Sequence, residues 1–514
     1  MGDIDIFGID LGTTNSLIAY WNPDTRQAEV VGDQDGNRLL PSVVSFDSST
    51  GEPVAVGRSL EDHRNNAGEA VYSVKRFIGR SFREESVKED KGRVTYEIAE
   101  TTDKTVVIRI GDREMTPSQV SALILQKLKA IAETRFPGKP VNRAVITVPA
   151  YFNEAQRQAT KEAGDLAGLE VPRIINEPTA AALAFGLGSE PQTVAVYDLG
   201  GGTFDISILR IDHGLFRVRA TDGDTHLGGD DFDAAIVEWV TNEFKQRHDW
   251  QLPTDLDSRT ELLLAARGAK SELTEHDQAE ITLPKSTDMS GRTSDSSVTL
   301  GRATFVELVR PLIERSINKC ETALKKAALK TSNIDQVLLV GGQTRTPAVK
   351  EAVRSYFKCP VNDSVNPDEV VARGAAMMAA RLYGYMKDEI LLFDVIPISL
   401  GVQDSEGKMR TIVKANTSIP VTVWEREAFT TNRDGQTEIT FQIFQGEQPI
   451  ATDNVQIGEA ILKLVRPLPA GVPLISCMFK IDSDGILHVH AEDTTTQAEP
   501  VDVKIDYLHK IVQR

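Results

Sequence analysis

Two similar glycine-rich segments constrain the fold of this chain more than any other feature. Residues 7–14 read FGIDLGTT and residues 195–203 read AVYDLGGGT. In each segment an apolar strand is followed by an aspartate, a leucine, small residues and a threonine. A segment that recurs in this form predicts two similarly built lobes that face each other across a cleft.

The composition of the two turns indicates what such a cleft would hold. A turn of glycine and threonine exposes backbone N–H groups and hydroxyls with little bulk, so it can wrap phosphate oxygens closely. The aspartates at the strand ends, Asp10 and Asp198, would be repelled by a phosphate but could hold a hydrated Mg²⁺ that neutralises it. Two turns from opposite lobes would thus clamp a triphosphate.

A third glycine stretch supports the same reading. Residues 337–349, VLLVGGQTRTPAV, end an apolar strand with Gly341 and Gly342, where a base and ribose could approach the backbone, and Arg345 could stack on the base. Each stretch alone would more often be an ordinary turn. The three in this order favour nucleotide binding, although the Walker-type phosphate loop, the GxSxG elbow and the HExxH motif are absent from the sequence.

Length, charge and cysteine use narrow the class of protein. A chain of 514 residues is expected to form more than one domain, and its net charge of −18 argues against a nucleic-acid partner. No stretch reaches the roughly 20 apolar residues of a membrane helix. The three cysteines fit no metal or disulfide spacing, and the N-terminus lacks the pattern of a signal peptide, so we expect a cytoplasmic protein.

The secondary-structure pattern changes about three quarters of the way along the chain. Residues 1–386 alternate strand-like and helix-like segments, with helices expected over 116–136 after the cap Thr116 and over 153–169 after Asn153. Beyond residue 395 the apolar residues alternate, and Asp484–Gly485 marks a hairpin between two strands of an antiparallel sandwich. Between the halves lies DEILLFDV (388–395), either a buried strand at a domain edge or a linker that docks in one state and is released in another.

Motifs along nearly the whole chain resemble those of the heat-shock protein 70 (DnaK-type) chaperones. The resemblance implies an actin-like α/β ATPase domain of two lobes around a nucleotide cleft over 1–386 and an interdomain linker over 387–396. An antiparallel β-sandwich that binds peptides would follow over 397–507, and 508–514 would be the stub of an absent helical lid. The motifs that carry it are GIDLGTTNS (8–16), KRFIGR (75–80), VITVPAYFNEAQRQAT (145–160), RIINEPTAAALAFG (173–186), YDLGGGTFDIS (197–207), GDTHLGGDDFD (223–233), LVGGQTRTP (339–347), DVIPISLGV (394–402), NTSIP (416–420), FQGE (444–447) and IDSDGILHVHAED (481–493).

The resemblance also implies an ATPase that uses ATP and ADP with Mg²⁺ and K⁺. Lys75 would point at the γ-phosphate and the attacking water, which Asp205 would help to orient. Asp10 and Asp198 would hold hydrated Mg²⁺ and, in part, K⁺. With Thr203 these residues form the predicted hydrolytic set. The expected phosphate turns are Gly12, Thr13, Thr14, Asn15 and Gly200, Gly201, Gly202, Thr203, and the other expected nucleotide contacts are Gly229, Lys270, Thr274, Gly341, Gly342, Arg345 and Asp368.

Further matched positions concern communication between the domains. Considered alone, Arg157 and Arg173 would be solvated or salt-bridged surface arginines. The resemblance instead implies that Arg157 helps to relay nucleotide state and that Arg173 belongs to the J-domain surface. Expected partners are unfolded client peptides, a J-domain co-chaperone and a nucleotide exchange factor, with no nucleic acid and no membrane. The residues expected to relay nucleotide state are Pro149, Arg157, Glu177, Leu391, Leu392 and Asp394, and the J-domain surface would include Arg173, Asn176 and Asp394.

In the sandwich the resemblance implies a pocket for an extended apolar peptide segment. Recognition would combine backbone hydrogen bonds with one deep side-chain pocket, although core packing is the ordinary role of any single apolar residue there. Ser405 and Asn432 stand where the family often has apolar residues that arch over the peptide, and residues 421–428 suggest a slightly long loop that carries Trp424. The expected pocket residues are Val402, Phe429, Ile439, Phe441 and Ile475.

Arg267 departs from the family pattern, since a glutamate usually stands there, and we expect it to affect ribose contacts. Three alternatives to a general chaperone remain. A small-molecule kinase on the same fold would have no use for a second β domain. A filament protein would polymerise on addition of ATP. A specialised paralogue with few clients is consistent with Arg267, Ser405 and Asn432.

Overall fold

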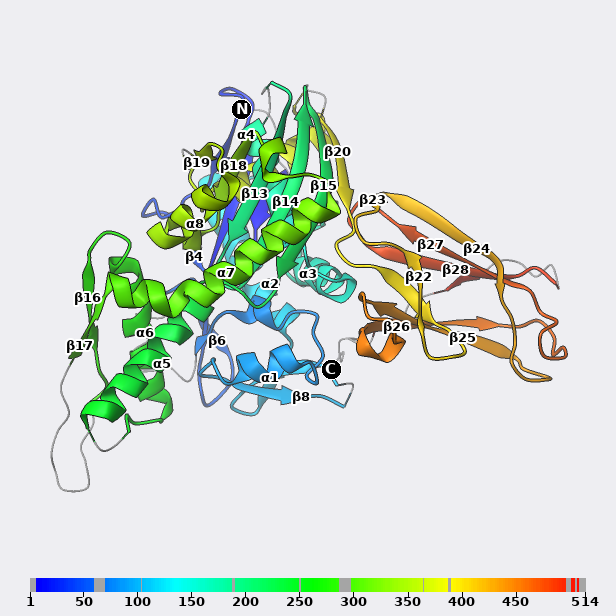
Figure 1. Cartoon of the computed structure of the whole chain (residues 1–514), viewed down its shortest axis with the longest axis horizontal. Helices are drawn as coiled ribbons and strands as arrows, with labels where there is room; N and C mark the ends of the chain where they lie inside the picture. Colours follow the sequence, from blue (N-terminus) through cyan, green and yellow to red (C-terminus); the bar gives the residue numbers. More distant parts are fainter. Residues whose placement is uncertain are drawn as a thin grey trace.

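The computed structural model describes residues 6–59, 70–102, 104–186, 190–248, 251–285, 297–363, 365–386 and 390–495, and the backbone of 501–503 and 506–507. Two sheets lie side by side in the first three quarters of the chain, and two further sheets form the last quarter (Figure 1). The residues expected to form a lid stub, 508–514, and linker residues 387–389 lie outside this description.

The first lobe is built on a mixed sheet. Its strands follow the order β12-β11-β1-β2-β3, and β4 pairs with β2. Helices α2 and α3 cover one face, and the core residues of α4 and α9 pack on the other. The elements are β1 (Ile6–Asp10), β2 (Asn15–Asn22), β3 (Gln27–Val30), β4 (Leu40–Pro41), β11 (Arg143–Val148), β12 (Ile174–Asn176), α2 (Pro117–Arg135), α3 (Glu154–Leu166), α4 (Glu177–Gly186) and α9 (Val370–Leu382).

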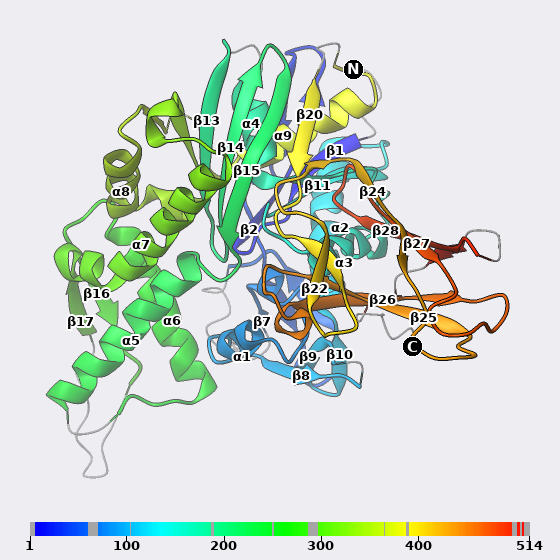
Figure 2. The same cartoon turned by 45° about the vertical axis from the view of Figure 1, so that its right-hand side comes forward.

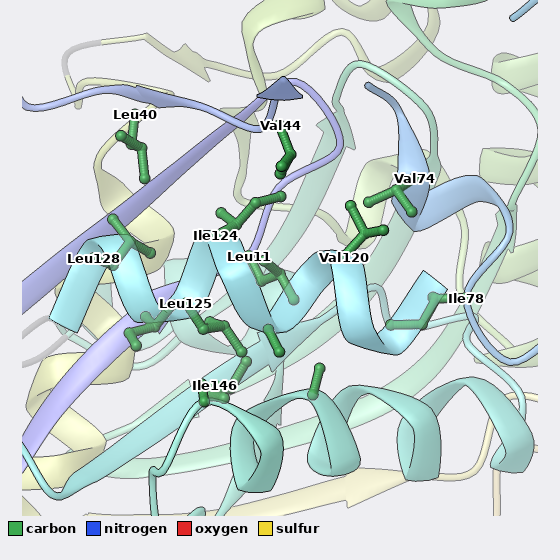
Figure 3. Close-up of a cluster of buried hydrophobic side chains, with 14 of the residues drawn as sticks. Leu11, Leu40, Val44, Val74, Ile78, Val120, Ile124, Leu125, Leu128 and Ile146 are labelled. Carbon is green, nitrogen blue, oxygen red and sulfur yellow. The ribbon is translucent and has the colours of Figure 1, made fainter. Parts of the chain in front are cut away.

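Two predicted helix starts of this lobe are confirmed. Thr116 and Asn153 each accept a hydrogen bond from the backbone N–H three residues on, and Gln119 and Gln156 bond back to the cap. Such reciprocal caps fix where a helix begins because they satisfy otherwise unpaired N–H groups. Apolar residues of α2 then pack between the sheet and neighbouring segments; Figure 3 shows Ile124, Leu125 and Leu128 directed to Leu11, Leu40 and Ile146.

The second lobe repeats this plan. Its sheet has the order β19-β18-β13-β14-β15-β20-β23, and α5, α7 and α8 bury its outer face. Helices α4 and α9 lie between the two large sheets and share one core with both, so the lobes join at their base. The elements are β13 (Gln192–Leu199), β14 (Phe204–Asp212), β15 (Leu215–Asp224), β18 (Gln336–Val340), β19 (Val361–Asn362), β20 (Leu391–Val395), β23 (Ser418–Ile419), α5 (Gly229–Arg247), α7 (Arg302–Lys326) and α8 (Pro347–Phe357).

Smaller units extend each lobe on the side of the cleft away from that shared core (Figure 1). The first lobe adds two three-stranded sheets and α1, and the second adds α6 and a hairpin. The elements are β5 (Val44–Phe46), β6 (Pro53–Val56), β7 (Ala70–Val71), η3 (Val74–Arg76), α1 (Glu85–Lys91), β8 (Glu97–Glu100), β9 (Val106–Ile110), β10 (Arg113–Met115), α6 (Leu256–Glu272), β16 (Gln278–Thr282), β17 (Ser297–Gly301), η4 (Thr331–Asn333) and η5 (Gly342–Arg345).

The last quarter of the chain forms two antiparallel sheets around one core. The sheets have the orders β22-β21-β25-β26-β30 and β24-β27-β28-β29, and both contribute buried residues to a shared cluster. The predicted hairpin at Asp484–Gly485 joins β27 and β28 and is confirmed. The elements are β21 (Leu400–Gln403), β22 (Met409–Val413), β24 (Val421–Phe429), β25 (Glu438–Gln445), η6 (Ala451–Asp453), β26 (Val455–Lys463), β27 (Ile475–Ile481), β28 (Leu487–Asp493), β29 (Val501–Val503) and β30 (Asp506–Tyr507).

One local prediction was wrong. Residues 421–428 were expected to form a loop, but they belong to strand β24, which pairs with β27 and contains a register shift between Glu425 and Phe429. Trp424 lies opposite Met478 in this pairing, and its ring approaches His490 edge-on at 5.9 Å. Four steps along β24, from Glu425 to Phe429, face two steps along β27, from Cys477 to Ile475, so the bulge holds two extra residues where the sequence suggested a longer loop. Among the described residues, no helix is both long and apolar enough to cross a membrane.

Candidate active site in the cleft between the lobes

The two glycine-rich turns meet face to face. The first joins β1 to β2 and the second joins β13 to β14, so each lobe supplies one turn from the centre of its sheet. A Cβ atom on Gly201 would lie 2.0 Å from Oγ1 of Thr14, and one on Gly202 would lie 2.7 Å from Cγ2 of Thr13. The second turn therefore favours glycine at these positions because the threonine side chains of the first turn occupy the space that a side chain would need.

The turns border a cavity of about 350 Å³. Of the residues predicted to hydrolyse or bind a nucleotide, all but Gly202 and Asp205 line it. That volume is within the range of small-molecule sites. The predicted residues in its wall are Asp10, Gly12, Thr13, Thr14, Asn15, Lys75, Asp198, Gly200, Gly201, Thr203, Gly229, Lys270, Thr274, Gly341, Gly342, Arg345 and Asp368.

Buried carboxylates gather beneath the turns. Asp10 ends β1, Asp198 is the last but one residue of β13, and Asp205 stands directly opposite Asp198 in the β13–β14 pairing. Asp205 lies behind the cavity wall, where its Oδ1 accepts a hydrogen bond from the N–H of Tyr151 at 3.0 Å. The cation that faces this group is Lys75, whose Nζ lies 2.6 Å from Oε1 of Glu177.

Burial and mutual repulsion raise the pKa values of this cluster. Burial, and then the charge of Glu177, raise the pKa of Asp10 to about 7 and that of Asp205 to about 8. The same two causes raise the pKa of Asp198 well above its ordinary value. Four acidic side chains thus share one lysine. Among the described residues no three acidic or histidine side chains are placed to hold a metal ion directly, so this excess of negative charge fits a cation bound through its waters.

The far end of the cavity carries paired charges beside a bare backbone. Gly341 adopts φ +83, and a Cβ there would lie 2.4 Å from the carbonyl oxygen of Leu199. Arg345 Nη2 lies 2.6 Å from Asp368 Oδ2, and Lys270 donates to the carbonyl of Gly229 at 2.8 Å. Gly341, Gly342 and Arg345 all line the cavity, and the expectation that a base and ribose lie against them stays a prediction.

Arg267 has a different place from the one expected. Its side chain lines the cavity but turns to two carboxylates, with Nη2 at 3.0 Å from Asp230 Oδ1 and Nε at 3.1 Å from Asp233 Oδ2. The sequence analysis quoted GDTHLGGDDFD as a motif yet took only Gly229 from it. These two aspartates of the motif were missed, and the acidic run at the start of α5 was the available signal.

Comparison with known proteins agrees with this geometry. A model of the family described as Hsp70 protein matches residues 6–509. The chain belongs to the Hsp70 family. Members of this family are ATPases and ATP-dependent chaperones that bind ATP or ADP with Mg²⁺ and work with client polypeptides and co-chaperones.

In this Hsp70 chain the segment between the halves is part of the second lobe's sheet. Strand β20 runs parallel to β15, with Leu392 opposite Phe216 (Figure 2). Its side chains alternate: Leu392 packs against the core shared by the lobes, whereas Leu391 is 56% exposed. Both leucines lie in the docked strand, since Leu391 pairs with Leu215 through the backbone, but their side chains face opposite sides of it. Their expected role in relaying nucleotide state stays a prediction.

Asp394 ties this strand to helix α4. Its Oδ2 accepts a hydrogen bond from Oγ1 of Thr179 at 3.0 Å, and burial raises the pKa of the carboxyl above its ordinary value. Thr179 lies two residues after Glu177, which contacts Lys75. The carboxylate cluster around Lys75 and strand β20 are thus linked through the first turn of α4.

The first lobe contacts the hairpin of the C-terminal sheets. Arg157 is buried, donates to Asn176 Oδ1 at 2.8 Å and reaches the carbonyl of Asp484 at 3.4 Å. Asp484 Oδ1 in turn accepts from the N–H of Ile174 at 3.2 Å and lies 3.3 Å from Nε of Arg173. Arg157 is therefore an interface residue and not a solvated one. The loop that follows Pro149 supplies another acceptor for Arg157, the carbonyl of Ala150.

The residues predicted for a J-domain surface lie at this same interface. Asn176 and Asp394 are 3% and 7% exposed, and Arg173 faces the hairpin. These side chains contact other parts of the chain in this structure, and their expected part in binding a J-domain partner stays a prediction.

The five predicted peptide-pocket residues belong to the core between the two C-terminal sheets. Val402, Ile439, Phe441 and Ile475 are buried, and Phe429 is partly buried with its ring 5.1 Å from that of Phe441. Ser405 and Asn432 are exposed outside the strands, and the expected polar arch over a peptide stays a prediction. A residue not predicted covers Phe429: the Arg410 guanidinium lies 4.9 Å above its ring. Arg410 also pairs with Glu425 at 2.5 Å.

Proposed function

We propose that the cleft hydrolyses ATP to ADP and phosphate, and that nucleotide state controls peptide binding by the C-terminal sheets through β20. The observation that carries this proposal is the short path Lys75–Glu177, helix α4, Thr179–Asp394. A change in charge at the cleft would alter the partner of Glu177, and α4 is rigid enough to pass that change to β20.

Bound Mg·ATP would supply the phosphoryl group and a metal that neutralises its charge. Asp10 and Asp198 would hold the metal through its waters, with K⁺ as a second counterion for the excess carboxylates. The backbone N–H groups of the two turns would hold phosphate oxygens, and Thr203 would add a hydroxyl. Lys75 would place its charge beside the transferred group. Asp205, behind the wall, would position Asp198 and the loop at Tyr151.

In the C-terminal sheets, an apolar side chain of an extended client would enter between Val402, Ile439 and Phe441 while its backbone pairs with a strand edge. Entry would require Phe429 and the Arg410 guanidinium above it to move aside. The polar turns at Ser405 and Asn432 would arch over the peptide.

A J-domain co-chaperone that binds Arg173 would compete with Asp484 for its guanidinium, and so would weaken the contact between lobe and hairpin. An exchange factor would act by separating the lobes. We propose that both a J-domain co-chaperone and an exchange factor act on this chain.

The decisive experiment is fluorescence anisotropy of a labelled leucine-rich peptide in Mg·ADP and then in Mg·ATP. We expect weaker binding in ATP. Equal affinity in both states would contradict nucleotide control, and no binding in either state would contradict the peptide pocket.

A small-molecule kinase is the second candidate on this fold. It predicts phosphorylation of a soluble acceptor by ATP, whereas the chaperone predicts release of free phosphate that needs no acceptor. The C-terminal sheets and the pairing of β20 with β15 favour the chaperone, since a kinase has no need of either.

A further inference from the structure

One arginine of the C-terminal sheets stands on the face that carries the core. Arg410 of β22 lies directly opposite Val402 of β21, which is buried and belongs to the predicted peptide pocket. Residues directly opposite each other in a pairing share one face of the sheet. The Arg410 side chain is 39% exposed, so its guanidinium lies at the boundary between the core and water.

This guanidinium bridges the edges of the two sheets. Strand β22 ends one sheet and β24 ends the other. Nη2 of Arg410 lies 2.5 Å from Oε2 of Glu425, and Nη1 donates to the carbonyl oxygen of Ala428 at 3.2 Å, both on β24. The bulge between Glu425 and Phe429 contains Ala428, so the irregular part of β24 receives the arginine.

Two aromatic rings lie beneath the guanidinium. Cζ of Arg410 stands 4.9 Å from the centre of the Phe429 ring. That ring meets the buried Phe441 ring at 5.1 Å and at an angle of 87°. A cation over the face and a second ring at the edge are contacts that an aromatic side chain makes and an aliphatic one does not.

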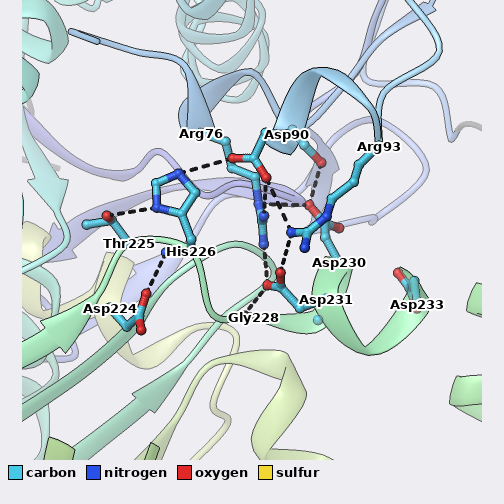
Figure 4. Close-up of polar contacts among 12 residues, drawn as sticks. Arg76, Asp90, Arg93, Asp224, Thr225, His226, Gly228, Asp230, Asp231 and Asp233 are labelled. Atoms are coloured by element: carbon cyan, nitrogen blue, oxygen red, sulfur yellow. Dashed lines mark hydrogen bonds and ion pairs between the residues drawn. The ribbon is translucent and has the colours of Figure 1, made fainter. Parts of the chain in front are cut away.

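Arg410 also retains more of its charge than the arginines between the lobes. Arg76 there contacts both Asp90 and Asp231, as Figure 4 shows, so two carboxylates neutralise it. Among the contacts of the described residues, Arg410 pairs with one carboxylate, that of Glu425. Its positive charge therefore remains available to an aromatic ring, whose electron-rich face attracts a cation.

We propose that the pocket selects client segments whose anchoring side chain, the one that enters between the sheets, is aromatic, and that Arg410 determines this preference. The proposal rests on the proposed function, in which an extended client binds there. When Phe429 and the guanidinium move aside, the client's ring takes the place of the Phe429 ring, and the guanidinium returns over its face while Phe441 meets its edge. An aliphatic side chain of the same size fills this space but gains neither contact.

The test compares two labelled peptides that differ only in the anchoring residue, which is phenylalanine in one and cyclohexylalanine in the other. These side chains are close in size and both are apolar, but only phenylalanine has an aromatic face. Fluorescence anisotropy in Mg·ADP should show about three- to tenfold tighter binding of the phenylalanine peptide, the range expected for a partly desolvated cation–π contact. Arg410→Met should lower this ratio of affinities to about one or less.

Two further variants separate the contact from other effects. Glu425→Ala frees the guanidinium from one of its two holds on β24 and should lower the ratio, because Glu425 is a positioning residue for Arg410. Lys408→Met removes an exposed cation that pairs with Glu406, and it should keep the ratio of the unchanged chain. If Arg410→Met does not fold, Arg410→Lys, which keeps the charge but loses the planar face, must still lower the ratio.

Equal affinity of the unchanged chain for the two peptides would overturn the preference, and so would an unchanged ratio in Arg410→Met or, if that variant does not fold, in Arg410→Lys. The inward-facing charges would then serve only to protect the sheet edges from pairing with other chains. The failure of the proposed function would look different, since neither peptide would bind in any nucleotide state.

Discussion

The Nζ atom of Lys75 lies 2.6 Å from Oε1 of Glu177, and both side chains are buried at the base of the cleft. Lys75 comes from a 3-10 helix of the first lobe's extension, and Glu177 begins α4. This ion pair holds the positive charge of Lys75 beside Glu177, one of the four acidic side chains of the cluster. Because Glu177 also begins α4, the proposed coupling would pass from the cleft to α4 through this residue.

Removal of Lys75 should impair hydrolysis more than binding. Lys75→Ala is expected to lower the rate of ATP hydrolysis by about a hundredfold or more, the usual loss when one preorganised charge is removed from a reacting group. ATP should still bind, because the phosphate turns remain. Single-turnover hydrolysis and equilibrium ATP binding measure the two effects. Lys88→Ala, at an exposed pair with Glu85, is the control, and normal turnover in Lys75→Ala would refute its role.

The carboxylate cluster predicts that stability depends on both pH and metal. Burial and Glu177 raise the pKa of Asp10 to about 7 and that of Asp205 to about 8, so the folded state holds protons that the unfolded chain releases above about pH 4. The free energy of unfolding should therefore fall as pH rises from about 4 to 8. A cation bound at these carboxylates would replace the protons and so offset the loss of stability at higher pH.

Melting temperature with Mg·ADP, compared with ADP and EDTA, tests this linkage. We expect removal of Mg²⁺ to lower the melting temperature more at pH 8 than at pH 5.5. Asp10→Asn should reduce the difference between the two pH values. A metal effect that does not vary with pH would contradict the assignment of the raised pKa values to the cation site.

Because side chains alternate along β20, the adjacent residues Leu391 and Leu392 face opposite sides of the sheet. Leu392→Asp places a charge in the shared core and should abolish the ATP-dependent fall in peptide affinity, whereas Leu391→Asp, at an exposed position, should leave it nearly intact. Anisotropy of the labelled peptide in ADP and ATP measures both. Equal effects of the two substitutions would mean that the pairing of β20 with β15 does not carry the coupling.

Because the two phosphate turns lie close together, substitution of a glycine in a turn should lower nucleotide affinity, whereas substitution of a glycine with open space around it should not. Gly201→Ala would place a methyl group 2.0 Å from Oγ1 of Thr14, so the turns should separate and nucleotide affinity should fall at least tenfold. Gly268→Ala, on helix α6 with open space around it, should keep the affinity and raise stability slightly. Calorimetric titration with ADP measures the affinity of both variants. An unchanged affinity in Gly201→Ala would show that the turns can move apart without loss of nucleotide binding.

Several features could be predicted because they depend on local sequence. The capped starts of α2 and α3 follow from Thr116 and Asn153, and the hairpin of the C-terminal sheets follows from Asp484–Gly485. The repeated strand–aspartate–glycine pattern predicts a two-lobed cleft. The loop expected at 421–428 came from comparison with the family pattern, although the β-prone residues VTVW favour a strand. The bulge in that strand could not be predicted, since it depends on pairing with β27.

The sequence by itself therefore determined the elements and the chemistry of the cleft: glycines where backbones approach, carboxylates at strand ends, and the family to which the chain belongs. Only the tertiary structure decided which charges meet. It paired Lys75 with Glu177, turned Arg267 to Asp230 and Asp233, and partly buried Leu392 while exposing Leu391. The physical reason is that glycine turns, caps and alternation are fixed by neighbours along the chain, whereas ion pairs and stacking depend on distances between residues far apart in sequence.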